Sequence, residues 1–127
     1  DALCLLETSR RFRRAAVYGA SPSRLISYAS AEKPGSRADY VRFRDFMWAS
    51  LLASPVCYAE KIDAPLLVLH GMEDLDAPVE GAHQLFIAVK DTHPDVRTRI
   101  ALFPRSGHEL PAQKAAFLTE ITRWLAE

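Results

Sequence analysis

The sequence predicts an α/β protein with about three parallel strands and flanking helices. Helix-like and strand-like segments alternate along the 127 residues, in the order helix, strand, helix, strand, helix, strand, helix. This alternation is typical of parallel strands that are joined by right-handed crossovers. One expected strand, Leu66 to Leu69, is a continuous apolar run, which indicates a strand that is buried on both faces of such a sheet.

The first half of the chain is expected to form a helix, a strand and a second helix. Residues 2–11 are apolar at their start and predict a short buried helix, and residues 15–18 predict a short buried strand. We expect a loop over residues 30–38, which are small and polar. A helix over residues 39–53 follows, and its first residue can serve as the N-cap. The apolar face of that helix consists of Tyr40, Phe43, Phe46 and Met47.

The second half of the chain continues the alternation beyond the apolar strand. Residues 79–90 predict a helix, residues 96–103 predict a strand, and residues 112–126 predict a closing amphipathic helix. The residues expected on the buried face of the first of these helices are Leu85, Phe86 and Val89. The residues of the closing helix expected in the core are Ala116, Ile121, Trp124 and Leu125.

Composition and charge argue against several classes of partner and location. The 16 Lys and Arg residues balance 16 Asp and Glu residues, so nothing favours binding to nucleic acid or to an anionic membrane. The apolar runs are too short to span a bilayer, and no signal peptide is visible. The two cysteines make no disulfide framework, so a reducing cytoplasm is the default location. Four basic residues are expected to be solvated at the end of the first helix: Arg10, Arg11, Arg13 and Arg14.

An acid and a histidine follow two successive strands of the predicted sheet. Asp74 comes shortly after the strand that ends near Leu69, and His108 comes shortly after the strand that ends at Phe103. Catalytic groups of an open parallel sheet gather beyond the carboxyl ends of its strands. In a Ser-His-Asp relay the histidine takes the proton of the serine, and the acid orients the ring and stabilises its cation. The chain order of acid before histidine is the one found in α/β-hydrolases.

Several further motifs surround these two residues: Ser54-Pro55, Ile62-Asp63-Ala64-Pro65-Leu66-Leu67, His70-Gly71, Pro78 and Gly107-His108. With them, the stretch from Ser54 to Trp124 resembles the C-terminal part of the prolyl oligopeptidase family of serine peptidases. The resemblance implies an α/β-hydrolase fold. It identifies Asp74 as the acid, because the acid of that family lies four residues after the His of His-Gly, and His108 as the general base. It implies no cofactor and no metal.

The resemblance also bears on the missing nucleophile. Ser21 follows a strand and a glycine, but Pro22 is incompatible with the tight turn that presents a nucleophilic serine. The start of the chain instead resembles the helix after a Gly-x-Ser-x-Gly elbow, which implies that the serine lies before Asp1. We therefore expect residues 1–127 to be a C-terminal fragment of the catalytic domain that is inactive alone. Its first strand would have an open edge, so we expect self-association (a homo-oligomer) or association with the missing N-terminal part.

Supporting roles are expected for other polar and aromatic residues. Asp76 is expected to cap a helix or to order the loop ahead of Pro78, and His70 to order the same loop from a strand end. Neither His83 nor His93 has metal-ligand spacing with a second good ligand. Three aromatic residues are expected to contribute to the core or to a domain contact, with a substrate pocket as the alternative: Phe43, Phe46 and Trp48.

The function implied by the resemblance is that of a serine peptidase acting on a peptide substrate. Serine attack would form an acyl-enzyme, which water activated at His108 would hydrolyse. A carboxylesterase or dienelactone-hydrolase-like enzyme shares the motif pattern. An upstream β-propeller would favour the peptidase, and a short chain with a lid would favour the esterase. The remaining alternative is a non-catalytic hydrolase-fold fragment that acts as an interaction module. An exposed apolar edge that is buried in a dimer, with Asp74 and His108 too far apart to pair, would favour it. The sequence assigns no residue to substrate binding.

Overall fold

Alternating strands and helices form a three-stranded sheet between two helical layers. The computed structural model of the chain describes residues 3, 12–19, 42, 44, 45, 48, 49, 51–109 and 113–127. In chain order the elements are β1 (Ala15–Tyr18), the 3₁₀ helix η1 (Pro55–Lys61), β2 (Leu66–Gly71), α4 (Val79–Thr92), β3 (Thr98–Phe103) and α5 (Lys114–Ala126).

β2 is the central strand of the sheet. The strand order is β1-β2-β3, and both pairings are parallel. Val68 of β2 is paired with Val17 of β1 on one side and with Ile100 of β3 on the other. All six residues of β2 are buried, which confirms that its apolar run belongs to a strand covered on both faces. The predicted α/β class with three parallel strands is therefore confirmed, and β2 extends two residues further than expected, through Gly71.

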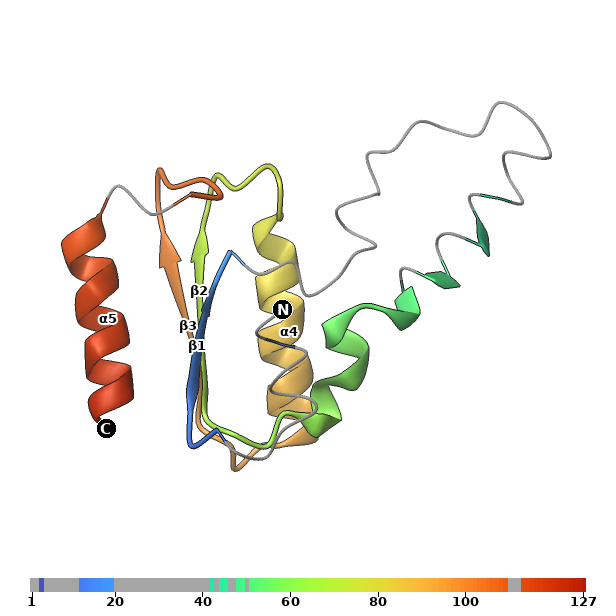
Figure 1. Cartoon of the computed structure of the whole chain (residues 1–127), viewed down its shortest axis with the longest axis horizontal. Coiled ribbons are helices and arrows are strands. Elements are labelled where there is room, and N and C mark those ends of the chain that lie inside the picture. Colours follow the sequence, from blue (N-terminus) through green and yellow to red (C-terminus); the bar gives the residue numbers. More distant parts are fainter. Residues whose placement is uncertain are drawn as a thin grey trace.

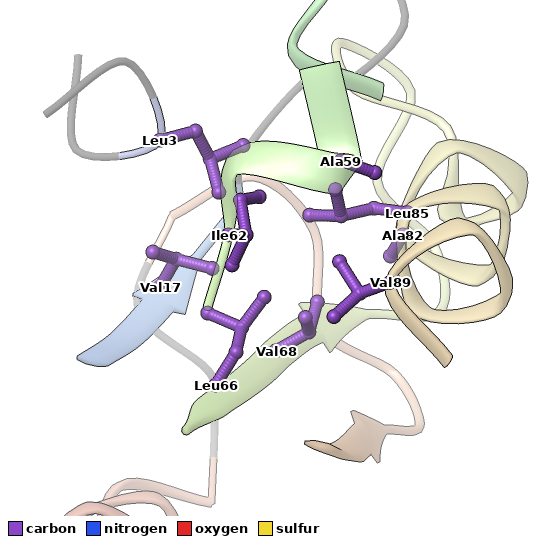
Figure 2. Packing of buried hydrophobic residues seen from close by; sticks show 9 residues of the cluster. All are labelled: Leu3, Val17, Ala59, Ile62, Leu66, Val68, Ala82, Leu85 and Val89. Atoms are coloured by element: carbon purple, nitrogen blue, oxygen red, sulfur yellow. The ribbon is translucent and has the colours of Figure 1, made fainter. Parts of the chain in front are cut away.

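Successive side chains of β2 serve two separate cores because a strand alternates its side chains between the two faces of the sheet. Leu66 and Val68 point towards α4 and η1, where they join the cluster drawn in Figure 2. The members of this cluster are Leu3, Val17, Ala59, Ile62, Leu66, Val68, Ala82, Leu85 and Val89. Leu67 and Leu69 point towards α5 and pack with Phe103, Phe117 and Trp124. Figure 1 shows the corresponding layers, with α5 on one side of the sheet and α4 on the other.

α5 contacts the sheet through a narrower stripe than the sequence pattern predicted. Trp124 is buried and Ile121 is half-buried, as expected, but Ala116 and Leu125 are exposed, so their assignment to the core is wrong. Phe117 takes the core position instead. Successive side chains of an α-helix are rotated by about 100° around its axis. This rotation places Ala116 and Leu125 beyond opposite edges of the stripe that faces the sheet.

Two groups anchor the end of α5 to the start of β1. The indole Nε1 of Trp124 donates a hydrogen bond to the carbonyl of Ala15 at 2.8 Å, and the guanidinium of Arg14 donates to the carbonyl of Trp124. Arg97 stacks on the indole, 4.8 Å from its centroid. Arg14 is half-buried, so the expectation of a fully solvated basic cluster is wrong for this residue. Arg13 is exposed, and Arg10 and Arg11 lie outside the described residues.

The other predicted elements are met where the structure describes them. Leu3 is helical and buried, while the rest of residues 2–11 and the loop over residues 30–38 lie outside the described part of the chain. Helical residues within the predicted helix 39–53 are Arg42, Arg44, Asp45, Trp48, Ala49, Leu51 and Leu52, whereas its predicted apolar face, Tyr40, Phe43, Phe46 and Met47, falls outside the described residues. α4 buries Leu85 and Val89 and half-buries Phe86. Among the described residues, no helix has the length and apolar character needed to cross a membrane.

The end of β2 lies directly beneath the loop that follows β3. Two backbone hydrogen bonds join them, from the N–H of Met72 to the carbonyl of Phe103 at 3.0 Å and from the N–H of Glu73 to the carbonyl of Ser106 at 2.9 Å. A Cβ atom at Gly71 would overlap the carbonyl oxygens of Ser106 and Gly107 and lie 2.7 Å from the carbonyl carbon of Ser106. Only glycine therefore fits at the end of β2 without displacing the loop.

We predict that Gly71→Ala destabilises the protein by about 1–3 kcal/mol, because the new methyl group meets backbone atoms that cannot rotate away. Gly107→Ala is the matched control. A Cβ there would lie 3.7 Å from the carbonyl oxygen of Glu73, an ordinary contact, and Gly107 does not have a positive φ. Urea unfolding of both variants measures the difference. Equal unfolding midpoints for the two variants would contradict the close approach at Gly71.

Candidate functional site

The two loops that follow β2 and β3 lie side by side at the carboxyl edge of the sheet (Figure 1). We call residues 72–78 the acid loop and residues 104–109 the histidine loop. β2 and β3 are parallel and pair through Gly71 and Phe103, so both loops leave the sheet at the same level. This arrangement brings together the two residues that the sequence singled out, Asp74 and His108.

Asp74 and His108 form a direct hydrogen bond. The ring Nδ1 of His108 lies 3.0 Å from Oδ2 of Asp74. The carboxylate is fully buried, whereas 48% of the imidazole side chain is exposed. Since Nδ1 faces the carboxylate, Nε2 is left for a different partner, and no described residue hydrogen-bonds to it. The pair is therefore shielded from solvent at Asp74 and accessible to solvent at His108.

The carboxylate of Asp74 also closes the acid loop. Its Oδ1 accepts hydrogen bonds from the backbone N–H groups of Asp76 at 3.0 Å and Ala77 at 2.8 Å. One oxygen thus holds the loop and the other holds the ring of His108. All three partners can act as donors, which matches an ionised carboxylate, since that group only accepts hydrogen bonds.

His70 supports the acid loop from the end of β2. Its side chain is fully buried, and its Nε2 lies 2.6 Å from the carbonyl oxygen of Ala77 and 3.4 Å from Oδ2 of Asp74. A carbonyl only accepts, so Nε2 carries the proton and Nδ1 does not when the ring is neutral. The expectation that His70 orders this loop agrees with these contacts.

Asp76 does not cap the following helix. The N-cap of α4 is Pro78, which has no side-chain capping hydrogen bond, and the Asp76 side chain is exposed. The expected cap is therefore wrong, because the carboxylate that orders the loop is that of Asp74. Asp74, Asp76 and His108 each offer one atom that could bind a metal ion, and these three atoms all lie within 4.8 Å of one another, a spacing that a cation could bridge. Three N–H groups already use three of the about four lone-pair sites of the Asp74 carboxylate, so the geometry fits a hydrogen-bonded pair better than a cation site.

The remaining sequence candidates lie away from this pair or outside the described residues. His83 is exposed on α4, and Nε2 of His93 lies 2.6 Å from the carbonyl oxygen of Glu60. Trp48 is 60% exposed, which contradicts a core role within this chain. Phe43, Phe46 and Ser21 are not among the described residues.

Sequence reasoning missed the contribution of β1 to this site. The hydroxyl of Tyr18 lies 3.0 Å from the carbonyl oxygen of Gly107 and 2.5 Å from that of Glu109, the two neighbours of His108. Gly19, with a φ of 58°, follows it beside the histidine ring. The signal was available, because Tyr18 ends a strand at the same carboxyl edge as the acid and the histidine.

Tyr18 is also a titratable group within the site. Its partial burial, together with the negative charge of Asp74, raises the pKa of the phenol above its ordinary value of 10.0. The hydroxyl therefore keeps its proton, and its ability to donate, throughout the neutral range.

We predict that Tyr18 contributes to loss of stability at alkaline pH. A phenol with a higher pKa in the folded state stabilises the protein fully below its unfolded value, and this contribution is lost as the pH rises through the folded value. The free energy of unfolding should therefore fall above about pH 10, and less steeply in Tyr18→Phe. Tyr58→Phe is the control, because it removes a hydroxyl that donates to the carbonyl of Leu52 at 2.6 Å. Denaturant unfolding from pH 8 to 11 measures this effect, and identical profiles for wild type and Tyr18→Phe would refute it.

Comparison with known proteins identifies the family of this chain. The family model described as "Prolyl oligopeptidase family" matches residues 2–127. The chain is 40% identical over 76 residues to "Uncharacterized peptidase YuxL" of Bacillus subtilis. This alignment covers 56% of this chain and 11% of that protein. It is 30% identical over 83 residues to the "Acylamino-acid-releasing enzyme" of Sus scrofa, covering 62% of this chain and 11% of that protein. The chain thus spans about a tenth of the length of these relatives.

A solved structure shows the same fold. The acylaminoacyl peptidase of Pyrococcus horikoshii superposes with a TM-score of 0.75 at 20% sequence identity, covering 98% of this chain and 21% of that chain. This likeness confirms the expected portion of an α/β-hydrolase fold. Since the family model matches nearly the whole sequence, the chain belongs to the prolyl oligopeptidase family.

Proposed function

We propose that this chain supplies the acid and the general base of a serine peptidase, with Asp74 as the acid and His108 as the base. The observation that carries the proposal is the 3.0 Å hydrogen bond between Nδ1 of His108 and Oδ2 of Asp74. The nucleophilic serine of the relay is proposed to lie N-terminal to Asp1 in the whole protein. Family membership supports the peptidase class, because the curated relatives are described as a peptidase and an acylamino-acid-releasing enzyme.

The proposed reaction is acyl transfer through Nε2 of His108. This nitrogen takes the proton of the serine hydroxyl while the serine oxygen attacks the carbonyl carbon of the scissile bond. The imidazolium then gives that proton to the leaving amine, and the carbon–nitrogen bond breaks to leave an acyl-enzyme. In the second half, His108 takes a proton from water while the water oxygen attacks the acyl carbon. The bond from that carbon to the serine oxygen then breaks, the serine oxygen receives the proton, and the carboxylic acid leaves.

Burial of Asp74 supports its role throughout this cycle. The positive charge that forms on His108 lies against a carboxylate with no exposed side-chain surface. The attraction between the two charges is weakened less by water than it would be at the surface. The two N–H donors on Oδ1 keep the carboxylate oriented while the ring changes its charge. The exposed part of the imidazole is the part that a serine from another segment can reach.

The substrate class proposed is an acylated peptide, in line with the name of the Sus scrofa relative. The same relay would also hydrolyse a carboxylic ester, so an esterase is the second candidate function. The contact between Asp74 and His108 weighs against the third reading, a non-catalytic interaction module, because a separated pair would have favoured that reading. We propose that residues 1–127 alone do not hydrolyse either substrate, since no serine nucleophile is assigned within them.

We predict that Asp74→Asn lowers kcat of the whole protein on an acetyl-aminoacyl anilide by about 10⁴-fold, because the amide cannot hold the histidine in its working tautomer and cannot balance its charge. Asp76→Asn is the matched control, since it removes the neighbouring exposed carboxylate of the same loop. The control is expected to keep nearly wild-type activity. Labelling of the serine by a fluorophosphonate probe gives a second readout that does not depend on the peptide.

Two further measurements complete this test. His108→Gln is expected to abolish both hydrolysis and labelling, whereas His83→Gln, on the exposed surface of α4, is expected to affect neither. Hydrolysis of an acetyl ester with no detectable hydrolysis of the acetyl-aminoacyl anilide would favour the esterase, because a serine peptidase cleaves both. If folded Asp74→Asn retains as much activity as Asp76→Asn, the proposed relay is wrong.

A further inference from the structure

We propose that Tyr18 is a positioning residue, whose hydroxyl holds the backbone on both sides of His108 so that the ring stays in contact with Asp74. This inference rests on the proposed function, since it concerns how the general base is held. It extends the site to β1, so that all three strands of the sheet contribute to the relay.

The hydrogen bonds of Tyr18 reach the two residues that flank the histidine. Its hydroxyl oxygen lies 3.0 Å from the carbonyl oxygen of Gly107 and 2.5 Å from that of Glu109. A phenol has a single proton, so it donates to one of these carbonyls at a time. The carbonyl of Gly107 belongs to the peptide group that joins it to His108, and the carbonyl of Glu109 lies one peptide group beyond His108. The hydroxyl therefore restrains the backbone both before and after His108.

The ring of Tyr18 is itself fixed by the core beneath α5. It meets Phe117 edge to face, with ring centroids 5.1 Å apart and an interplanar angle of 78°. Phe117 in turn packs edge to face against Phe103, at 5.7 Å and 65°. Such aromatic pairs have a preferred geometry, so the phenol cannot swing away without breaking them. The position of the hydroxyl is thus set by the packing of α5 and β3.

The residue after Tyr18 lies against the histidine ring. A Cβ atom built on Gly19 would be 3.6 Å from both Nδ1 and Cε1 of His108. The backbone N–H of Gly19 is bonded to the carbonyl of Leu69 at 3.3 Å, which ties this segment to β2. The end of β1 therefore approaches both the backbone and the ring of the general base.

Other described restraints on the histidine loop lie before Gly107. The hydroxyl of Ser106 is bonded to the side chain of Gln113 at 2.9 Å, and the carbonyl of Ser106 accepts from Glu73. The described hydrogen bonds to residues 107–109 are those of the two Tyr18 contacts with backbone carbonyls and the one between the His108 ring and Asp74. Among the described residues, removing the hydroxyl of Tyr18 would leave the bond from the ring to Asp74 as the remaining hydrogen bond to residues 107–109.

The test is the Tyr18→Phe variant of the whole protein, which keeps the aromatic contact with Phe117 and removes only the hydroxyl. Tyr58→Phe is the matched control, because its hydroxyl also donates to a backbone carbonyl, that of Leu52 at 2.6 Å, but on η1. We expect Tyr18→Phe to lower kcat by about 10- to 100-fold with KM nearly unchanged, because small errors in the position of a catalytic group are costly. The rate of serine labelling by a fluorophosphonate is expected to fall in parallel.

The measured unfolding midpoints of the two variants separate positioning from stability. Each loses one hydrogen bond to a carbonyl, so similar midpoints with a lower kcat only in Tyr18→Phe would support the proposal. Equal kcat in Tyr18→Phe and Tyr58→Phe would overturn it. Asp74→Asn in the same assay tests the proposed function separately from the role of Tyr18. If Asp74→Asn is inactive while Tyr18→Phe is unimpaired, only the role of Tyr18 fails, and if Asp74→Asn is fully active, the proposed function fails as well.

Discussion

The burial of β2 on both faces is the constraint from which the rest of the structure follows. The side chains of Leu66 to Leu69 alternate between the α4 core and the α5 core, so both helical layers depend on the same four residues. The backbone of β2 is paired on both edges, with β1 on one side and β3 on the other. Because every pairing is parallel, the carboxyl ends of all three strands lie at one edge. The order and direction of the strands therefore set the position of the candidate site, independently of its polar side chains.

The carboxylate of Asp74 links loop structure to chemistry. Its Oδ1 orders the acid loop through two backbone N–H groups, and its Oδ2 orients His108. A buried carboxylate without these donors would be strongly unfavourable, so the hydrogen bonds that stabilise the loop also allow an ionised acid to remain at this position. Gly71 adds a steric condition, since it lets the backbone of the histidine loop approach the end of β2.

The sequence predicted those parts of the molecule that depend on local patterns. The apolar run of β2, the short strand β1 and the spacing of Leu85 and Val89 on α4 each reflect a period that is visible in a few residues. Asp74 and His108 could be found because each follows a predicted strand. The misassigned residues of α5, Ala116 and Leu125, and the cap expected at Asp76 are local errors, whereas the errors at Arg14 and Tyr18 concern contacts between distant segments. Arg14 donates to a carbonyl 110 residues away, and Tyr18 reaches backbone groups about 90 residues away, which no local period encodes.

The fold persists through large changes in sequence, and the candidate site of this chain depends on few side chains. The Pyrococcus horikoshii structure shares only 20% of the aligned residues with this chain, yet it superposes with a TM-score of 0.75. Most partners in the site described above are backbone groups, which any residue type supplies at the same place. The side chains that the arrangement needs are few and end or follow the three strands: Tyr18, His70, Asp74 and His108. The geometry of the Asp74–His108 pair thus depends on more than the two loops that carry it, because β1 contacts the histidine loop through the hydroxyl of Tyr18.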